Sequence, residues 1–322
     1  MEEKLHKSVQ NFQPFEKLIE KNGVIILDGA LGTQLEAKGA DLKNGLWSAS
    51  LLKTHPELIQ EVQLDYLEAG ADIIATAGYQ ASLPAFIKNG YTEEQGIELI
   101  RKTVELAQEA REQFINQNPH LESRPLIAAS MGPYGAYLAN GSEYHGNYGV
   151  NYSDLVQFHK NGIRLIQDLN ADILAFETIP SMEESMAIVE ALRDFPKLKC
   201  WISFSCRNET EVSHGEKLGD CIQKIQDSDQ VVAMGINCTK PEFVESLIYQ
   251  VKQNTQKWII VYPNKGEVYD AEKKIWTENH NTLDFIELSQ KWYNAGARII
   301  GGCCGTNPEN IVELSKYFKT KK

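Results

Sequence analysis

Short apolar runs alternate with longer amphipathic runs along almost the whole chain. The apolar runs are rich in Ile, Val and Ala, and the amphipathic runs repeat their apolar residues at helical spacing. Strands are predicted at 24–28, 72–77, 126–131, 172–177, 199–205, 231–237, 257–262 and 297–301. Helices are predicted to follow them at 56–69, 92–115, 153–169, 182–193, 218–225, 242–253, 282–294 and 308–318. Apolar strands separated by helices are typical of parallel sheets.

Repeated strand–helix units joined by short links predict an α/β fold, a closed (β/α)8 TIM barrel in one domain over residues 1–322. The alternative is an open doubly wound sheet. It is disfavoured because the stretch 28–33 lacks the spacing of a phosphate-binding glycine motif. In a barrel, active sites lie at the C-terminal ends of the strands. The tyrosine- and glycine-rich stretch 132–149 is predicted to be a loop over that mouth, with an ordinary surface insertion as the alternative.

Charge and composition exclude several classes of protein. The net charge is −12 and no basic stripe is present, which argues against a nucleic-acid partner. No apolar run is long enough to cross a bilayer, and residues 1–7 lack the apolar core of a signal peptide. We therefore expect a cytoplasmic protein without a membrane partner. In that reducing setting its six cysteines are expected to be metal ligands or core thiols.

Three cysteines follow predicted strands in glycine-containing stretches: Cys238 in 235–238, and Cys303 and Cys304 in 301–306. Neighbouring residues of a strand point to opposite faces, so two adjacent sulfurs reach one point only after the strand has turned. Glycine permits such a turn. The sixth and eighth strands lie roughly 10 Å apart, so these thiolates are predicted to bind one Zn²⁺ with a position left open. The alternatives are a core thiol at the first cysteine and a vicinal disulfide or redox switch at the pair.

A site of this kind suits the activation of a substrate thiol. A thiol bound to the metal loses its proton near neutral pH, whereas a free thiol has a pKa of about 8.5. The resulting thiolate is a nucleophile for alkyl transfer. Asp28 and Glu177, which end apolar strands, are either a general acid and base or the binding site of a substrate ammonium group. Transfer from a sulfonium donor favours the second role because its leaving group is neutral.

The remaining candidates would complete a substrate site at the mouth. The backbone N–H groups of 29–31 are candidates for binding an amino-acid carboxylate. Aromatic side chains near the strand ends offer faces to a cationic donor. The candidate substrate-binding residues are Asp28, Gly29, Ala30, Trp47, Tyr79, Tyr134, Glu177 and Asn237.

Four motifs, at 28–33, 177–178, 235–238 and 301–306, resemble those of the homocysteine S-methyltransferases and keep their order. The resemblance implies a zinc-dependent barrel that methylates homocysteine to methionine. It implies that the three cysteines hold the zinc and that Asp28 and Glu177 bind the amino group of homocysteine. It further implies that Tyr79 approaches the zinc when substrate is absent. It also implies that Trp47 lies on the side of the site where the methyl donor binds.

The stretches 132–138 and 141–144 resemble the branch of that family that uses S-methylmethionine, with S-adenosylmethionine as the poorer donor. The chain lacks a cobalamin or folate module and the dimerising arm of betaine–homocysteine methyltransferase. Open alternatives are a betaine-type donor, a selenocysteine or selenohomocysteine acceptor and, outside enzymes, a vicinal-thiol redox or zinc sensor. The expected partners are homocysteine and a sulfonium methyl donor. A monomer is expected, with a weak dimer as the alternative.

Overall fold

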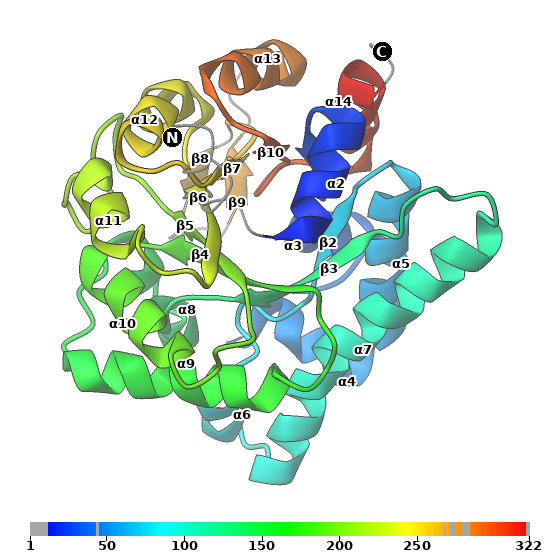
Figure 1. Ribbon diagram of the computed structural model, residues 1–322. Helices are drawn as coiled ribbons and strands as arrows, with labels where there is room; N and C mark the ends of the chain where they lie inside the picture. The colour runs from blue at the N-terminus through cyan, green and yellow to red at the C-terminus, as the bar shows by residue number, and fades with distance from the viewer. Residues whose placement is uncertain (1–11, 43–44, 267, 271–274, 278–283, 320–322) are drawn as a thin grey trace.

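A ring of parallel strands forms the centre of the computed structural model, and helices surround it (Figure 1). The structure describes residues 12–42, 45–266, 268–270, 275–277 and 284–319. The strands of the ring are β1 (Ile25–Ile26), β2 (Ile73–Ala75), β3 (Leu126–Met131), β4 (Ile173–Ile179), β5 (Cys200–Phe204), β6 (Val231–Asn237), β7 (Trp258–Tyr262) and β10 (Ile299–Ile300). Their order is β1-β10-β7-β6-β5-β4-β3-β2. A parallel bridge between Leu27 and Ile73 joins the two end strands and closes the barrel. The predicted fold is confirmed.

A helix follows each strand of the ring, as the amphipathic pattern predicts. These helices are α5 (Pro56–Glu68), α7 (Glu93–Gln117), α9 (Tyr152–Ile166), α10 (Met182–Leu192), α11 (Leu218–Ile225), α12 (Pro241–Asn254), α13 (Phe285–Ala295) and α14 (Pro308–Lys319). Residues 282–283 of the predicted seventh helix lie outside the described residues, and α13 begins after Asp284. The Oδ1 atom of Asp284 accepts a hydrogen bond from Ile286 N at 2.8 Å, which caps the helix.

Several elements were not predicted, and most of them are too short to complete a recognisable period. The exception is the helix Gln13–Asn22, whose 10 residues exceed the eight of the predicted α11. The unpredicted elements are α2 (Gln13–Asn22), α3 (Leu31–Ala37), η1 (Trp47–Ser50), α4 (Leu51–Thr54), α6 (Leu83–Lys88), α8 (Tyr134–Leu138), η2 (Ser142–Tyr144) and the antiparallel pair β8 (Val268–Asp270) and β9 (Ile275–Thr277). The stretch 132–149, predicted to be a loop over the mouth, contains the two short helices α8 and η2.

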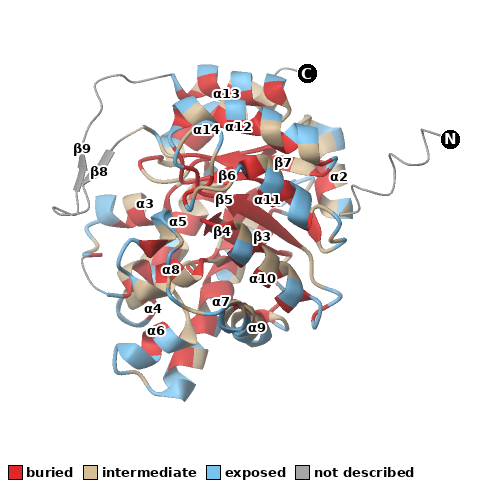
Figure 2. Ribbon diagram, turned by 90° about the vertical axis from the view of Figure 1, so that its left-hand side faces the viewer, coloured by how far each residue is buried: buried red, intermediate tan, exposed pale blue. Residues whose placement is uncertain are grey.

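The core has two layers. Side chains inside the ring, among them Trp201 and Ile260, form one cluster, and Phe15 and Leu18 of α2 pack into the same cluster. The second layer lies between the strands and the outer helices. Figure 2 shows buried strands at the centre and helices whose outer sides are exposed. Within the described part of the chain, no helix has the length and apolar character needed to span a membrane.

Carboxylates at the N-terminal ends of two strands tie the barrel to its helices. Asp72, directly before β2, accepts a hydrogen bond from Ile26 N at 2.9 Å and from Lys319 Nζ of α14 at 2.7 Å. Asp172, directly before β4, accepts from Ile127 N at 2.8 Å and from Arg111 Nη1 of α7 at 2.6 Å. Each aspartate thus joins a neighbouring strand to an outer helix.

Candidate metal and substrate site

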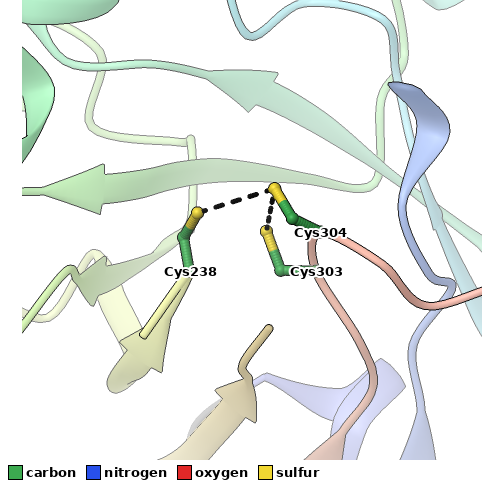
Figure 3. Close-up of side chains that lie close together, drawn as sticks. All are labelled: Cys238, Cys303 and Cys304. Atoms are coloured by element: carbon green, nitrogen blue, oxygen red, sulfur yellow. Dashed lines mark hydrogen bonds between the residues drawn. The ribbon is translucent and has the colours of Figure 1, made fainter. Parts of the chain in front are cut away.

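Three cysteine side chains converge at the C-terminal mouth of the barrel (Figure 3). Cys238 directly follows β6, and Cys303 and Cys304 lie beyond the end of β10. The Sγ atoms of Cys238 and Cys304 are 3.9 Å apart, and those of Cys303 and Cys304 are 4.0 Å apart. All three sulfurs lie within 4.8 Å of one another. The predicted convergence of the three thiols on one point is confirmed.

Backbone contacts hold the turn that carries Cys303. Its N–H donates to Pro263 O at 2.8 Å, and its carbonyl accepts from Thr306 Oγ1 at 2.6 Å. Gly302 has no room for a side chain, because a Cβ atom there would lie 2.3 Å from Thr306 Oγ1. Thr306 Oγ1 also accepts a hydrogen bond from Ala30 N at 3.2 Å. The glycine and the threonine therefore fix the turn that the sequence required, and the Ala30 amide is already used and not free for a substrate carboxylate.

Cys238, with φ 47°, and Thr178, with φ 61°, have left-handed backbones at the mouth although neither is glycine. Such conformations cost about 1–3 kcal/mol each and persist where surrounding contacts enforce them. Asn237 supplies those contacts for Thr178. Its Oδ1 accepts from Thr178 N at 2.7 Å, and its Nδ2 donates to Thr178 Oγ1 at 2.8 Å. Asn237 was predicted to bind substrate, but its amide bonds Thr178 and so positions the irregular end of β4 at Glu177 and Thr178.

The three thiols fit a metal ion. In a tetrahedral site with metal–sulfur bonds of about 2.3 Å, neighbouring sulfurs lie about 3.8 Å apart, close to the separations observed here. Hydrogen bonds from Cys303 and then Cys304 hold the pKa of Cys238 well below its ordinary value, so one ligand is readily a thiolate. The buried Oδ1 atom of Asn264, whose side chain also contacts Cys238, accepts no hydrogen bond within the described residues. An oxygen left without a donor beside three sulfurs is compatible with a cation at this point.

Asp28 and Glu177 lie close together beside the thiols, as predicted. Asp28 Oδ2 accepts a hydrogen bond from Ala75 N at 2.6 Å, and Glu177 accepts from Ser130 Oγ and from the Tyr262 hydroxyl. Removal from water raises the pKa of Asp28 to about 7, and the charge of Glu177 adds to that rise. It likewise raises the pKa of Glu177 to about 7. No ion pair is found for either carboxyl within the described ranges, so both are available to a cationic group of a ligand.

Of the predicted aromatic residues, two lie together at the site and one does not. The ring centroids of Trp47 and Tyr79 are 6.4 Å apart in an edge-to-face arrangement. Burial, followed by the charges of Glu143 and Cys238, raises the pKa of Tyr79 well above its ordinary value, and its hydroxyl bonds Thr178. The Tyr134 ring packs elsewhere, with ring centroids 5.3 Å from Tyr137, 5.4 Å from Tyr148 and 5.1 Å from Phe158. Tyr134 therefore helps to hold 132–149 against α9, which corrects its predicted place facing the donor.

Two neighbours in η2 reach the site, although the sequence did not single them out. The Tyr144 hydroxyl lies 3.3 Å from Cys238 Sγ, while 45% of the residue is exposed. Tyr144 is thus the tyrosine whose hydroxyl contacts a sulfur of the three cysteines, whereas the Tyr79 hydroxyl bonds Thr178. The Oε2 atom of Glu143 is buried without a hydrogen-bond partner within the described residues. Two signals pointed to this region: the tyrosine-rich composition of 132–149 and the resemblance of 141–144 to the branch that uses S-methylmethionine.

The structure is thus a (β/α)8 barrel whose mouth brings together three cysteines that could hold a metal ion and two carboxyls without an ion-pair partner among the described residues. The family model described as homocysteine S-methyltransferase matches residues 25–318. The chain belongs to this family.

Individual relatives agree over nearly the full length. A homocysteine S-methyltransferase of Bacillus subtilis (strain 168) is 43% identical over 311 residues, which cover 96% of this chain and 99% of that protein. A selenocysteine Se-methyltransferase of Brassica oleracea var. italica is 44% identical over 319 residues, covering 95% and 92%. The structure of the metallated form of the homocysteine methyltransferase MmuM from Escherichia coli superposes with a TM-score of 0.85. It is 39% identical, and the match covers 94% of this chain and 99% of that one.

Proposed function

We propose that this protein transfers a methyl group from S-methylmethionine, with S-adenosylmethionine as the poorer donor, to the thiolate of L-homocysteine, and that it holds one Zn²⁺. The observation that carries the proposal is the convergence of Cys238, Cys303 and Cys304 beside two carboxyls without a cationic partner in the described structure. Membership of the homocysteine S-methyltransferase family and the structural match to a metallated relative support it.

In this mechanism the three cysteines would hold the zinc, which, when bound, lowers the pKa of a coordinated thiol so that it is a thiolate at neutral pH. Asp28 and Glu177 bind the ammonium group of homocysteine through charge-assisted hydrogen bonds and so orient its thiol. The ammonium ion in turn favours the ionised form of both carboxyls. Trp47 and Tyr79 offer aromatic faces to the sulfonium of the donor.

Methyl transfer then needs no general acid. The thiolate sulfur forms a bond to the methyl carbon, and the bond from that carbon to the donor sulfur breaks. The bonding pair stays on the donor sulfur, which leaves as a neutral thioether and takes no proton. Homocysteine becomes methionine, and S-methylmethionine becomes a second methionine. This balance gives Asp28 and Glu177 a binding role rather than an acid–base role.

A selenium acceptor is a second candidate. It is favoured by the 44% identity to a protein named as a selenocysteine Se-methyltransferase. The same zinc and carboxylates would serve a selenol, because only the attacking atom differs. A competition assay with homocysteine and selenocysteine in one reaction distinguishes the two acceptors by the ratio of their methylated products.

The decisive experiment measures methionine formed from homocysteine with S-methylmethionine, S-adenosylmethionine and betaine side by side. S-Methylmethionine is expected to be the best donor. Cys303→Ala is expected to lose the bound zinc and to lower activity by more than about 100-fold, because one of three protein ligands is removed. Cys206→Ala is the matched control, since Cys206 is a buried thiol outside the cluster.

Turnover by metal-free protein would contradict the zinc-dependent mechanism. If methionine formed with betaine and with neither sulfonium compound, the methyl donor would be of the betaine type. If no donor gave methionine and Cys303–Cys304 oxidised reversibly, the protein would be a thiol sensor and not a methyltransferase.

A further inference from the structure

One carboxyl at the mouth has no role in the mechanism above. The Oε2 atom of Glu143 is buried, and no described residue donates a hydrogen bond to it. Glu143 lies near the site, because the hydroxyl of the next residue, Tyr144, is 3.3 Å from Cys238 Sγ. In agreement with this position, the charge of Glu143 helps to raise the pKa of Tyr79. A buried oxygen of this kind costs free energy unless something donates to it. Within the described residues, nothing satisfies this oxygen of Glu143.

The backbone around Glu143 is held from two directions. Gly135 of α8 packs so closely on it that a Cβ atom at Gly135 would lie 2.3 Å from Glu143 N. On the other side, Ser205 Oγ donates to Glu143 O at 3.4 Å. Any larger residue at Gly135 would push η2 out of place. The carboxyl therefore belongs to a fixed wall of the site and not to a freely moving surface segment.

A second glutamate fixes both ends of the segment that carries this wall. Glu184 of α10 is fully buried, and its Oε1 accepts from Tyr134 N at 2.6 Å and faces His159 Nε2 at 3.0 Å. Its Oε2 accepts from the Tyr148 hydroxyl at 2.8 Å. One carboxyl thus joins positions 134 and 148, on either side of Glu143. The two buried glutamate carboxyls contrast: that of Glu184 has partners on both oxygens, and that of Glu143 has an oxygen without one.

The charges of the two substrates identify what the free oxygen would bind. Homocysteine brings one ammonium group, for which Asp28 and Glu177 are already available. S-Methylmethionine brings a sulfonium and an ammonium group of its own. A sulfonium has no hydrogen to donate, and the aromatic faces of Trp47 and Tyr79 suit it. The ammonium group of the donor is the hydrogen-bond donor that remains unassigned.

We propose that Glu143 binds the ammonium group of the methyl donor and thereby selects amino-acid sulfonium compounds over donors whose only cation is fully alkylated. This inference rests on the proposed function and names its donor subsite. Glu143 accepts the N–H bonds of the donor on its otherwise unpartnered oxygen, while the methyl group points toward the cysteine cluster. A donor without an amino group leaves that oxygen unsatisfied and binds weakly.

The test is Glu143→Gln, with Glu183→Gln as the matched control on an exposed glutamate of α10. Glu143→Gln is expected to raise the KM for S-methylmethionine by about 10- to 100-fold, the loss expected for one charged hydrogen bond. The kcat, the KM for homocysteine and the zinc content are expected to stay within about threefold of the wild type. Calorimetric titration of S-methylmethionine into each protein measures the same loss without turnover. Glu183→Gln is expected to match the wild type throughout.

A dimethylsulfonium carboxylate without an amino group serves as the second probe. Its KM is expected to be high in the wild type and unchanged in Glu143→Gln. If the wild type is active and Glu143→Gln binds S-methylmethionine equally well, the inference is overturned while the proposed function stands. An equal rise in KM for both sulfonium donors would also overturn it. If the wild type forms no methionine with any donor, the proposed function fails, and the inference fails with it.

Discussion

The two ends of this barrel use carboxylates in opposite ways. At the N-terminal end, Asp72 accepts from a strand amide and also pairs with Lys319 at 2.7 Å. At the C-terminal mouth, Asp28 accepts from the amide of Ala75 in the same manner, at 2.6 Å, but no cation is found beside it within the described residues. Burial raises the pKa of Asp72 and Lys319 opposes the rise, whereas the pKa of Asp28 reaches about 7.

The difference separates carboxylates that stabilise the fold from carboxylates that are proposed to bind a ligand. A carboxylate whose hydrogen bonds and charge are satisfied by the protein has nothing left for a substrate. A carboxylate held by one amide, without a cation, is preorganised for a positive group from outside. In (β/α)8 enzymes the C-terminal face carries function and the N-terminal face stability. Here that division is visible in the partners of each carboxylate.

The largest expected effect is at the N-terminal end. Arg111→Met removes the guanidinium that lies 2.6 Å from Asp172 and is only 2% exposed. It leaves a partly buried carboxylate without its cation, so the free energy of unfolding is expected to fall by about 3 kcal/mol. Urea unfolding measures the loss. Arg101→Met, on the exposed side of the same helix, is expected to change it by less than about 0.5 kcal/mol.

The kinetic constants of Arg111→Met are the critical control. Because Arg111 is at the end of the barrel opposite the thiols, kcat and both KM values of the folded variant are expected to equal those of the wild type. A selective rise in the KM for homocysteine, with the unfolding free energy unchanged, would show that the two ends are not divided in this way.

The second-largest effect is expected at the C-terminal mouth, where a substitution should weaken substrate binding and not stability. Asp28→Asn keeps an oxygen for Ala75 N but removes the charge that the ammonium group of homocysteine would meet. The kcat/KM for homocysteine is expected to fall about 10- to 100-fold, the equivalent of one charged hydrogen bond. Stability is expected to stay the same or rise, because an unpaired carboxyl is removed from a poorly solvated place. Steady-state kinetics and urea unfolding together check both expectations.

The pH profile of the wild type tests the same carboxyls. The pKa values of Asp28 and Glu177 are raised to about 7 in the folded protein, from ordinary values of 3.8 and 4.5. The folded protein therefore holds protons that the unfolded chain releases, and ligand-free stability declines as the pH rises from about 4 through 7. Binding an ammonium group requires the ionised form, so the KM for homocysteine should rise as the pH falls below 7. A flat profile in the wild type would contradict the binding role.

The barrel and the convergence of the three cysteines could be predicted from the sequence for one physical reason. Strands buried on both faces are continuous apolar runs, and the carboxyl ends of parallel strands meet at one edge. Cys238 directly follows such a run and Cys303 lies just beyond another, so their convergence was predictable without contacts between distant residues. The positions of Asp28 and Glu177 at the mouth were predictable in the same way, because each ends an apolar run of the sequence, although β4 continues to Ile179.

The parts that were wrong or missed depend on contacts between residues far apart in the chain. Asn237 was expected to face substrate, but Thr178, on a different strand, occupies its amide. Tyr134 was chosen among the tyrosines of 132–149, whereas Tyr144 is the one that reaches a sulfur. Which tyrosine points inward is decided by where Glu184 holds the segment, and no local pattern encodes that contact. The role of a loop residue therefore becomes readable only with the fold.

The smallest effect is expected at the contact between Tyr148 and Glu184, which holds the stretch 132–149 in place at the mouth. Tyr148→Phe removes only the hydroxyl that donates to Glu184 Oε2 at 2.8 Å. Tyr152→Phe is its matched control, since that hydroxyl donates to Glu190 Oε2 at 2.9 Å on the exposed surface. Loosening one end of the segment should raise the KM for S-methylmethionine a few-fold, because Glu143 is then held less firmly. The free energy of unfolding should fall by about 1 kcal/mol.

The discriminating quantity is the ratio of the two KM values. Asp28 and Glu177 are held by strands and not by 132–149, so the KM for homocysteine should not change in Tyr148→Phe. Equal changes in both KM values would mean that the segment encloses the whole site and does not serve the donor specifically. No change in either, with Tyr152→Phe also silent, would mean that Gly135 and Ser205 alone hold Glu143 in place. Because the variants differ from the wild type by single hydroxyl groups, any difference between them measures that contact and not a general loss of packing.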